Sequence, residues 1–400
     1  MLKPTAILVL ISSVSICFAQ DDLSKQRQAL EKQLLDYTLA SNSTEATFAD
    51  EIAELKRQIE ALNKKLNAPN LEQTNHGWFS GFLHTQFTSI QSNGNTTADF
   101  RNRRTRLIYN HIGDSRTLGR FSVEFNTGVN QTSAQVRDAF IQYKPATYLA
   151  KSGPSYTIGQ QNTPLGYEIS YASFARTWPE RALYNQTYHA GERGRGVLYQ
   201  NGDSSNYWFA GLWSSLTVND IEAVTNTRGP AGETGPVAGV HVKAGAWEGG
   251  LSAISTRRPR FVSGATDLAT DDRKFSYFDL RYHPTKSKFD LRSEVMRGKD
   301  RIPGQNYLAT ETGGYHVSID YKLNKIDTFV LRHEEWDADT SLSGGLTTLN
   351  GIAYIRDVSQ FLRLSVAWQW NTQLGQATGT PANAPINSIQ QLTLRAQFKF

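Results

Sequence analysis

The chain has 400 residues, of which 39% are hydrophobic and 20% are charged, and its formal net charge is +5. This mild basic excess, without a basic cluster or a known binding motif, argues against nucleic acid as a partner and leaves small anions. The mean hydropathy of −0.47 resembles that of a soluble protein, but a membrane barrel alternates lipid-facing with lumen-facing residues and also averages to a polar value.

Residues 1–19 have the pattern of a secretory signal peptide. Lys3 precedes the apolar run AILVLISSV, and Ala19 ends a small-residue cleavage site. The alternatives are a short buried helix or an uncleaved anchor. The single cysteine of the chain, Cys17, lies in this segment, so the mature protein is expected to have no disulfide although it is exported.

Residues 22–67 are predicted to form a helical coiled coil. A heptad seam with spacings of three and four is formed by Ile52, Leu55, Ile59, Leu62 and Leu66. An earlier seam starts at Leu23 in a different register, so a break or a helical hairpin at residues 41–44 is an alternative to one continuous helix. A lone amphipathic helix packed on the rest of the protein also fits the pattern. Residues 68–76 are rich in Asn with a Pro and are expected to be a linker.

From residue 77 to residue 400 the hydrophobic period changes to two. Phe121, Val123 and Phe125, for example, alternate with Ser122 and Glu124. We count sixteen such runs of about ten residues, which is the length that a tilted strand needs to cross a bilayer. Short and long polar links alternate between the runs, as in outer-membrane barrels. The region is therefore predicted to be an all-β, 16-stranded antiparallel transmembrane barrel. A soluble sandwich or solenoid is disfavoured because its apolar faces would have to meet in one core of very large sheets.

The final run, LRAQFKF, is predicted to be the sixteenth strand and to close the barrel against the strand that begins near residue 78. Leu394, Phe398 and Phe400 would then face outer-membrane lipid, whereas Arg395 would face the lumen. The terminal aromatics Phe398 and Phe400 resemble the signal that the barrel assembly machinery reads. An ordinary edge strand is the alternative.

One long link, residues 162–192, is too long for a plain loop. Its surroundings resemble the phosphate-selective porin O/P family of Gram-negative outer membranes. The matching blocks, in the order of the family, are RRTRL (103–107), DAFIQYK (138–144), IGQQNTPLGYE (158–168), PERAL (179–183) and RGRGV (193–197). Downstream of about residue 237 only the alternation and the terminal aromatic match.

The resemblance implies a homotrimer of sixteen-stranded barrels in the outer membrane of a Gram-negative bacterium. It also implies that the segment 162–192 folds into the lumen as a constriction loop, that the N-terminal coiled coil stands in the periplasm, and that small anions pass by diffusion. In selective members arginines line the pore and lysines on the loop bind the anion. No cofactor, metal or catalytic residue is expected.

Arginine suits anion conduction, because its guanidinium is always charged and rings of basic side chains select anions. The candidate pore-lining residues, from parity along the strands or from the long link and its exit, are Arg103, Arg104, Arg106, Arg120, Arg176, Arg181, Arg193, Arg195, Lys243, Arg281, Arg292 and Arg332. Arg103 shares parity with the lipid-facing Leu107, so it would have to turn inwards near a rim. Cross-strand ion pairing with inward acids is the alternative role for each residue.

The long link departs from the family pattern. It contains no lysine and carries Glu168, Glu180 and Glu192. Glu180 and Arg181 would serve equally well to pin the link to the barrel wall. The sequence therefore favours a preference for anions without establishing specificity for phosphate.

The function predicted from the sequence is that of a porin for passive diffusion of small anionic solutes. An alternative is a non-selective general porin whose coiled coil is mainly a structural tether to the cell wall or to a partner. An enzyme is disfavoured because the sequence has no GxSxG, HExxH or P-loop motif. Residues 333–335, His-Glu-Glu, lie in a strand pattern that points alternate side chains to opposite faces.

Overall fold

The computed structural model describes residues 76–92, 94–128, 131–189, 193–214, 233–259, 270–300, 310–341, 345–374 and 385–400, with scattered helical positions between residues 28 and 60. Within that helical part, Arg57 Nε lies 2.9 Å from Glu54 Oε2, an i,i+3 pair on an exposed face. The predicted signal peptide, the heptad seam of the coiled coil and residues 68–75 of the linker lie outside the described residues. His76, the last residue of the predicted linker, already belongs to the first strand.

The chain divides into two compact units, residues 1–78 with 111–117 and residues 79–110 with 118–400. The strands are β1 (His76–Ser92), β2 (Asn95–Ile112), β3 (Thr117–Gly128), β4 (Gln131–Tyr143), β5 (Ser155–Asn162), β6 (Arg193–Gly202), β7 (Tyr207–Ser214), β8 (Thr234–Ala244), β9 (Trp247–Pro259), β10 (Thr270–Tyr282), β11 (Phe289–Asp300), β12 (Thr310–Lys322), β13 (Asp327–Asp337), β14 (Leu346–Asp357), β15 (Leu362–Leu374) and β16 (Pro385–Lys399). Two short helices, α3 (Gly166–Ser170) and α4 (Leu183–Tyr188), lie between β5 and β6.

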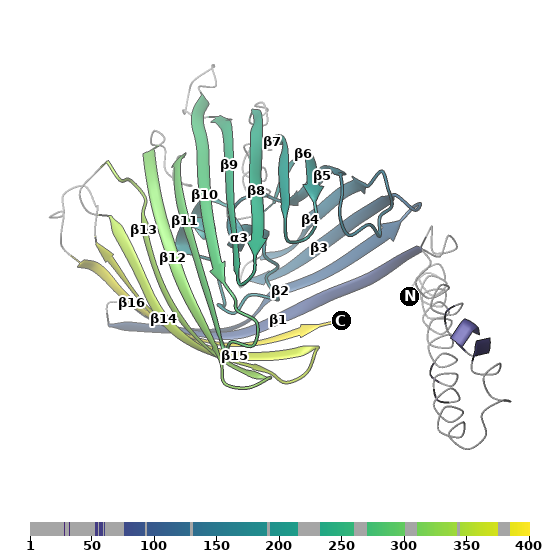
Figure 1. Ribbon diagram of the computed structural model, residues 1–400. Coiled ribbons are helices and arrows are strands. Elements are labelled where there is room, and N and C mark those ends of the chain that lie inside the picture. Colours follow the sequence, from purple (N-terminus) through teal and green to yellow (C-terminus); the bar gives the residue numbers. More distant parts are fainter. Residues whose placement is uncertain are drawn as a thin grey trace. The chain divides into compact units, whose positions relative to one another are not determined.

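The sixteen strands form one closed barrel in which each strand pairs with its neighbours in sequence (Figure 1). The barrel closes where β16 runs antiparallel to β1, with Thr85 opposite Ala396. Both the number of strands and this closing pair confirm the prediction. Among the described residues, none belongs to a helix that is long and apolar enough to cross a membrane.

The last residue is held by backbone hydrogen bonds. The Gly81 N–H donates to the Phe400 carbonyl at 2.9 Å, and the Phe400 N–H donates to the Gly81 carbonyl at 3.0 Å. A Cβ at residue 81 would meet the Arg106 carbonyl oxygen and lie 2.7 Å from the Phe400 ring, so this close approach needs a glycine. The terminal strand is therefore fixed to β1 along its whole end, which abolishes a free sheet edge.

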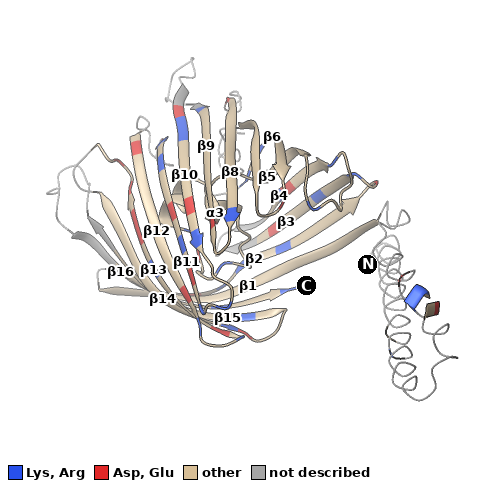
Figure 2. Ribbon diagram, in the orientation of Figure 1, with Lys and Arg blue, Asp and Glu red and all other residues tan. Residues whose placement is uncertain are grey.

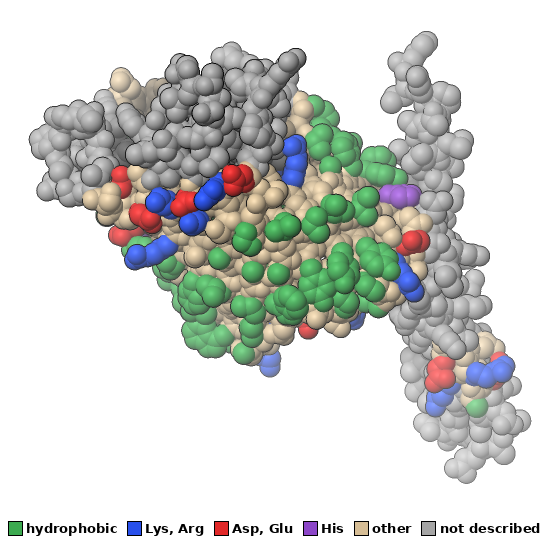
Figure 3. Space-filling model, turned by 90° about the horizontal axis from the view of Figure 1, so that it is seen from above, with side chains coloured by type: hydrophobic (Ala, Val, Ile, Leu, Met, Phe, Trp, Pro, Cys, Tyr) green, Lys and Arg blue, Asp and Glu red, His purple; other side chains and the backbone are tan. Residues whose placement is uncertain are grey.

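Alternation along the strands separates the two faces of the wall. On β10, Phe278 is 51% exposed on the outer face, whereas its neighbours Tyr277 and Asp279 are buried inside. Hydrophobic side chains gather on the outer face of the barrel, with charged residues along one edge (Figure 3). This apolar exterior fits the lipid-facing band of a membrane barrel.

The short link between β6 and β7 is a tight turn. At the link between β6 and β7, Gly202 has a φ of +130°. Asp203 Oδ1 then accepts hydrogen bonds from the N–H groups of Ser205 and Asn206 at 2.6 and 2.7 Å. Both features are expected of a tight turn, since glycine tolerates positive φ and aspartate accepts from nearby backbone N–H groups.

The hydrophobic core lies inside the barrel, between the β5–β6 connection and the inner face of β6–β11. The buried residues of this core are Leu165, Ile169, Ala182, Tyr184, Tyr188, Leu198, Phe209, Trp213, Val237, Ile254, Phe275, Tyr277 and Met296. This part of the wall is therefore apolar on its inner face as well as on its outer face. Its inward side chains are apolar because they pack on a folded segment and do not meet water.

Candidate functional site

The connection between β5 and β6, residues 163–192, folds into the barrel; we refer to it as the inner loop. Residues 163–189 of it are described. Gly166 starts α3 with a φ of +56°, and a Cβ there would lie 2.5 Å from Glu294 Oε2 of β11. Glycine thus allows the inner loop to approach the wall closely.

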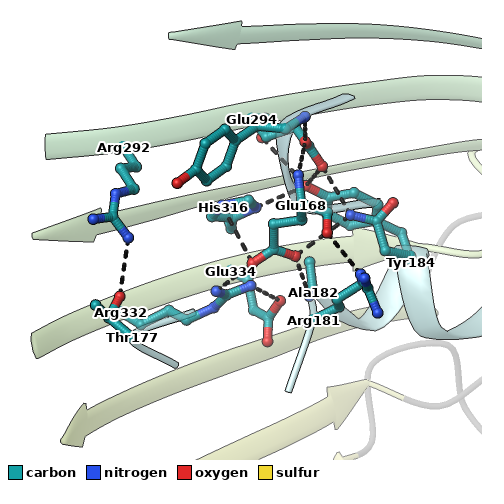
Figure 4. A network of polar contacts seen from close by, with 12 residues as sticks. Glu168, Thr177, Arg181, Ala182, Tyr184, Arg292, Glu294, His316, Arg332 and Glu334 are labelled. Carbon is teal, nitrogen blue, oxygen red and sulfur yellow. Dashed lines mark hydrogen bonds and ion pairs between the residues drawn. The ribbon is translucent and has the colours of Figure 1, made fainter. Parts of the chain in front are cut away.

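Glu294 is the main acceptor for the inner loop (Figure 4). Its Oε2 accepts hydrogen bonds from the N–H groups of Tyr167 and Glu168 at 2.5 and 3.0 Å. Its Oε1 accepts from Asn185 Nδ2 at 2.8 Å and from the Tyr184 hydroxyl at 3.1 Å. One wall carboxylate therefore holds both helices of the inner loop.

Arg332 of β13 forms the second anchor. Its Nη1 donates to Glu168 Oε1 at 2.6 Å, and its Nη2 donates to Glu334 Oε2 at 3.3 Å. Burial would raise the pKa of Glu168, but Arg332 and His316 more than offset this, so its pKa lies below the usual range. Glu168 is therefore a carboxylate paired with a buried guanidinium, an arrangement that is costly to break.

The far end of the inner loop is held by two other strands. Arg103 on β2 donates from Nε to Glu180 Oε1 and from Nη2 to Glu180 Oε2, both at 3.1 Å. Arg395 of β16 donates to Glu180 Oε1 at 2.6 Å. Burial raises the pKa of Glu180, yet these arginines outweigh it and hold the pKa well below its usual range.

A group of arginines surrounds this end of the inner loop; we call it the basic wall. It comprises Arg103, Arg104, Arg106, Arg120, Arg137, Arg193 and Arg395. In the part of the chain that the structure describes, these seven arginines share three carboxylates, those of Glu124, Asp138 and Glu180, which leaves a formal excess of four positive charges.

Several arginines of the basic wall share one carboxylate. Glu124 lies against Arg106, accepts from Arg137 at 2.9 Å and lies 3.9 Å from Arg104. At Asp138, the nearer guanidinium is that of Arg193 at 3.0 Å, with Arg120 at 3.5 Å. Each of these acids therefore positions two or three arginines.

Two interruptions of the strand alternation bring extra charges inside. Arg103 and Arg104 are consecutive on β2, and both reach acids inside the barrel. On β4, the consecutive residues Arg137 and Asp138 are both buried and paired inside. Such departures are expected at β-bulges, which re-aim side chains. Strict parity missed Arg137 for this reason, although two adjacent charges between Val136 and Ala139 are a usable signal.

A second group of charged residues faces inward from β11–β13; we call it the acidic wall. It comprises Asp290, Glu294, Asp320 and Glu334, with Arg292 and Arg332 between them. Arg292 lies 2.9 Å from Asp290 and 3.0 Å from Asp320, and it donates to Thr177 of the inner loop at 3.0 Å. The charged positions of the wall strands are marked in Figure 2.

The remaining predicted residues fall in different places. Arg176 and Arg181 are buried within the inner loop. Arg181 donates to the carbonyls of Glu168 and Ile169, which is a structural role. Arg281 pairs with Asp290, and Lys243 is exposed at the end of β8 opposite Glu248.

The structure places Arg195 on the outer face of β6. It shares that face with Val197, which is 48% exposed, and lies opposite Gln160, whose Oε1 accepts from Arg195 Nε at 3.0 Å. The inward position next to it is Gly194, where a Cβ would meet Trp213. The structure thus does not support Arg195 as a pore-lining residue, because it is exposed on the same face as Val197. Arg193 and Gly194 are both buried, so the alternation is interrupted just before Arg195.

Glu168, Glu294 and His316 bring three potential metal ligands within 4.8 Å of one another. Each already has partners in the network of Figure 4. Arg332 donates to Glu168, the inner loop fills both oxygens of Glu294, and the Tyr184 hydroxyl lies 2.8 Å from His316 Nδ1. The cluster therefore serves to hold the inner loop, and Arg332 supplies its positive charge.

No protein-family description matches the chain, and no curated protein matches it either. Solved structures do. An anion-selective porin from Comamonas acidovorans has a TM-score of 0.60 at 13% identity, covering 82% of this chain and all of the other (100%). OmpF of Salmonella typhi in complex with daunomycin has a TM-score of 0.59 at 10% identity, covering 82% and 99%. The outer membrane channel DcaP of Acinetobacter baumannii has a TM-score of 0.56 at 13% identity, covering 82% and 98%. The chain therefore has the fold of the outer-membrane porins.

Proposed function

We propose that the protein is an outer-membrane porin, a water-filled channel for the passive diffusion of small solutes that prefers anions. The observation that carries the proposal is the basic wall, in which seven described arginines gather beside the inner loop around Glu124, Asp138 and Glu180. Fixed positive charges in a narrow, partly desolvated passage raise the local concentration of anions. The anion-selective porin among the structural neighbours is consistent with this.

Specificity for phosphate is a narrower proposal than a general preference for small anions. The blocks that resemble the phosphate-selective O/P family contribute Arg103, Arg104, Arg106 and Arg193 to the basic wall and Glu180 to the inner loop. The inner loop has no lysine, so the strongly hydrated point charges that bind phosphate in selective members have no counterpart in it. A general preference for small anions fits these residues better than a phosphate-specific site.

A salt gradient across a planar bilayer tests the proposal. The purified full-length protein is inserted, and the reversal potential is measured in potassium chloride, with potassium phosphate and an organic anion compared afterwards. We expect chloride to be more permeant than potassium. A cation-selective reversal potential would refute the anion preference, and an absence of conductance from correctly folded protein would refute the channel.

For assembly, we propose a homotrimer in the outer membrane with residues 22–67 on the periplasmic side. The trimeric OmpT of Vibrio cholerae, a structural neighbour with a TM-score of 0.54, is consistent with this assembly. Deleting residues 22–67 separates two roles of the segment. Dissociation into monomers would assign it to assembly, whereas an unchanged trimer with unchanged conductance would favour a tether.

Deleting Phe400 tests the terminal assembly signal. If Phe400 is part of that signal, its deletion should impair insertion into the membrane.

A further inference from the structure

A separate cavity lies inside the barrel between α3 and the inner face of β7–β10; we call it the side pocket. Its volume is about 350 Å³, which is within the range of small-molecule sites. Its lining includes Tyr167, Tyr171, Tyr207, His241, Glu248 and Asp279. No arginine of the basic wall lines it, so it is distinct from the site proposed for anions.

Asp279 distinguishes the side pocket from ordinary wall. The residue is only 8% exposed, and it lines the cavity. Among the described residues, no donor forms a hydrogen bond or ion pair with its carboxylate, whereas nearby Glu248 is bonded by His241 at 3.1 Å. A buried carboxylate without a donor is costly, and a ligand that supplies the donor removes this cost.

The position of this carboxylate depends on a glycine. Gly250 lies opposite Asp279 in the β9–β10 pairing. A Cβ at residue 250 would lie 2.8 Å from Asp279 Oδ2 and 3.3 Å from His241 Nδ1. Residue 250 therefore leaves room for the carboxylate in its present place beside the cavity.

The other groups restrict the ligand. Arg281 is paired with Asp290 and lies 3.9 Å from Glu248, and His241 is bonded to Glu248, so these groups pair with one another and Asp279 is left as the acceptor that faces the cavity. Two stacked ring pairs, Tyr167 with Tyr171 at 4.8 Å and Tyr207 with His241 at 5.1 Å, add flat apolar surface.

We propose that the side pocket binds a neutral, polyhydroxylated solute of monosaccharide size. One hydroxyl donates to Asp279, other hydroxyl oxygens accept from Arg281 or His241, and the apolar face of the ring packs on a tyrosine. Such a ligand offers both donors and acceptors without net charge, which is what the lining requires. The protein would thus hold a neutral solute on one side of the lumen while anions pass along the other.

The test uses the full-length protein in a planar bilayer, with D-glucose added at increasing concentration while ion conductance is recorded. We expect a saturable decrease in conductance, because a bound solute obstructs the lumen. Asp279→Asn should raise the half-saturating glucose concentration by about tenfold, as expected from the loss of a charge-assisted hydrogen bond. Gly250→Ala, which displaces the carboxylate, should act in the same direction.

Asp357→Asn is the matched control. Asp357 lies at the end of β14, lines no part of the side pocket, and should keep the wild-type glucose response. Normal conductance without a saturable glucose effect would overturn this inference alone, whereas absent conductance would overturn the proposed channel. A glucose effect that both pocket variants leave unchanged would also overturn it. So would a decrease caused by ethylammonium or acetate in place of glucose, since the ligand would then be charged.

Discussion

The basic wall and the acidic wall contain the same kinds of charged side chain but differ in how these side chains are paired. In the acidic wall, Glu294 receives four donors from the inner loop, and Arg332 bridges Glu168 to Glu334. In the basic wall, Arg104 and Arg120 share carboxylates that other arginines approach more closely. Acids outnumber arginines in the acidic wall, whereas arginines outnumber acids in the basic wall, and both walls hold the inner loop through ion pairs.

This difference suggests a division of labour. A buried ion pair contributes little net stability over an apolar contact, but the loss of one partner is strongly destabilising. The acidic wall is therefore suited to fix one position of the inner loop. Arginines that share one carboxylate are suited to attract anions, and they fit a role in conduction.

The largest expected effect is that of a substitution in the acidic wall. Arg332→Met would leave Glu168 and Glu334 buried without their guanidinium, and should lower the free energy of unfolding by about 3–5 kcal/mol. Heat-dependent gel migration of the folded barrel measures this change, and single-channel recordings should show a noisier current. Arg356→Met is the control, because Arg356 is exposed and lies 3.8 Å from Asp327. If both variants were equally stable, the anchoring role would be wrong.

A smaller effect is expected from the acid of the inner loop that faces the basic wall. Glu180→Gln removes one negative charge there, so the ratio of chloride to potassium permeability should rise by about twofold, the effect of one unit charge at about 10 Å in water. Reversal potentials measure this ratio. Glu335→Gln removes the same charge from the outer face of β13 and should leave the ratio unchanged. A fall in the ratio for Glu180→Gln would contradict the assignment.

Acidification should weaken the contacts of Glu168 and Glu180 in the inner loop only at low pH. Both Glu168 and Glu180 have a lowered pKa in the folded protein. Their contribution to stability is thus complete above the ordinary glutamate pKa of about 4.3, and is lost only as the pH falls below it towards their folded values. Single-channel noise recorded against pH should rise as the pH falls below about 4.3. The absence of any rise below this pH would contradict the role of these two carboxylates in holding the loop.

The smallest effect is expected at Arg195. Because this side chain lies on the outer face of β6, Arg195→Gln should leave the reversal potential unchanged. Arg193→Gln, two residues earlier and paired with Asp138 inside, is the comparison and should lower the anion preference. Equal effects of the two substitutions would mean that Arg195 also reaches the lumen.

The sequence predicts the barrel well because alternation is a local signal. The closing pair of β16 with β1, and the inward position of Arg395, both follow from a period of two. The same rule places Asp138 inside but misses the buried Arg137 next to it, where one extra residue shifts the parity. Arg195 was assigned to the lumen from its position at the exit of the long link and not from this rule, which places it on the outer face with Val197.

The anchoring of the inner loop could not be predicted in the same way. Glu168 and Arg332 are separated by 164 residues, and nothing local to either residue identifies the other. The inner apolar core has a weak signal, because Phe275, Tyr277 and Phe278 place aromatics on both faces of β10. A strand that is apolar on both faces must be buried on both, and here the inner loop covers the second face.

The central claim is that the excess arginines of the basic wall set the preference for anions. Arg104→Gln with Arg120→Gln tests it most directly, because Glu124 keeps Arg106 and Arg137 and Asp138 keeps Arg193, so no carboxylate loses its nearest partner. The measurement is the reversal potential in a potassium chloride gradient. We predict an anion-selective wild-type protein and a double variant whose potential moves clearly towards zero at unchanged thermal stability. An identical potential in the two proteins would contradict the account.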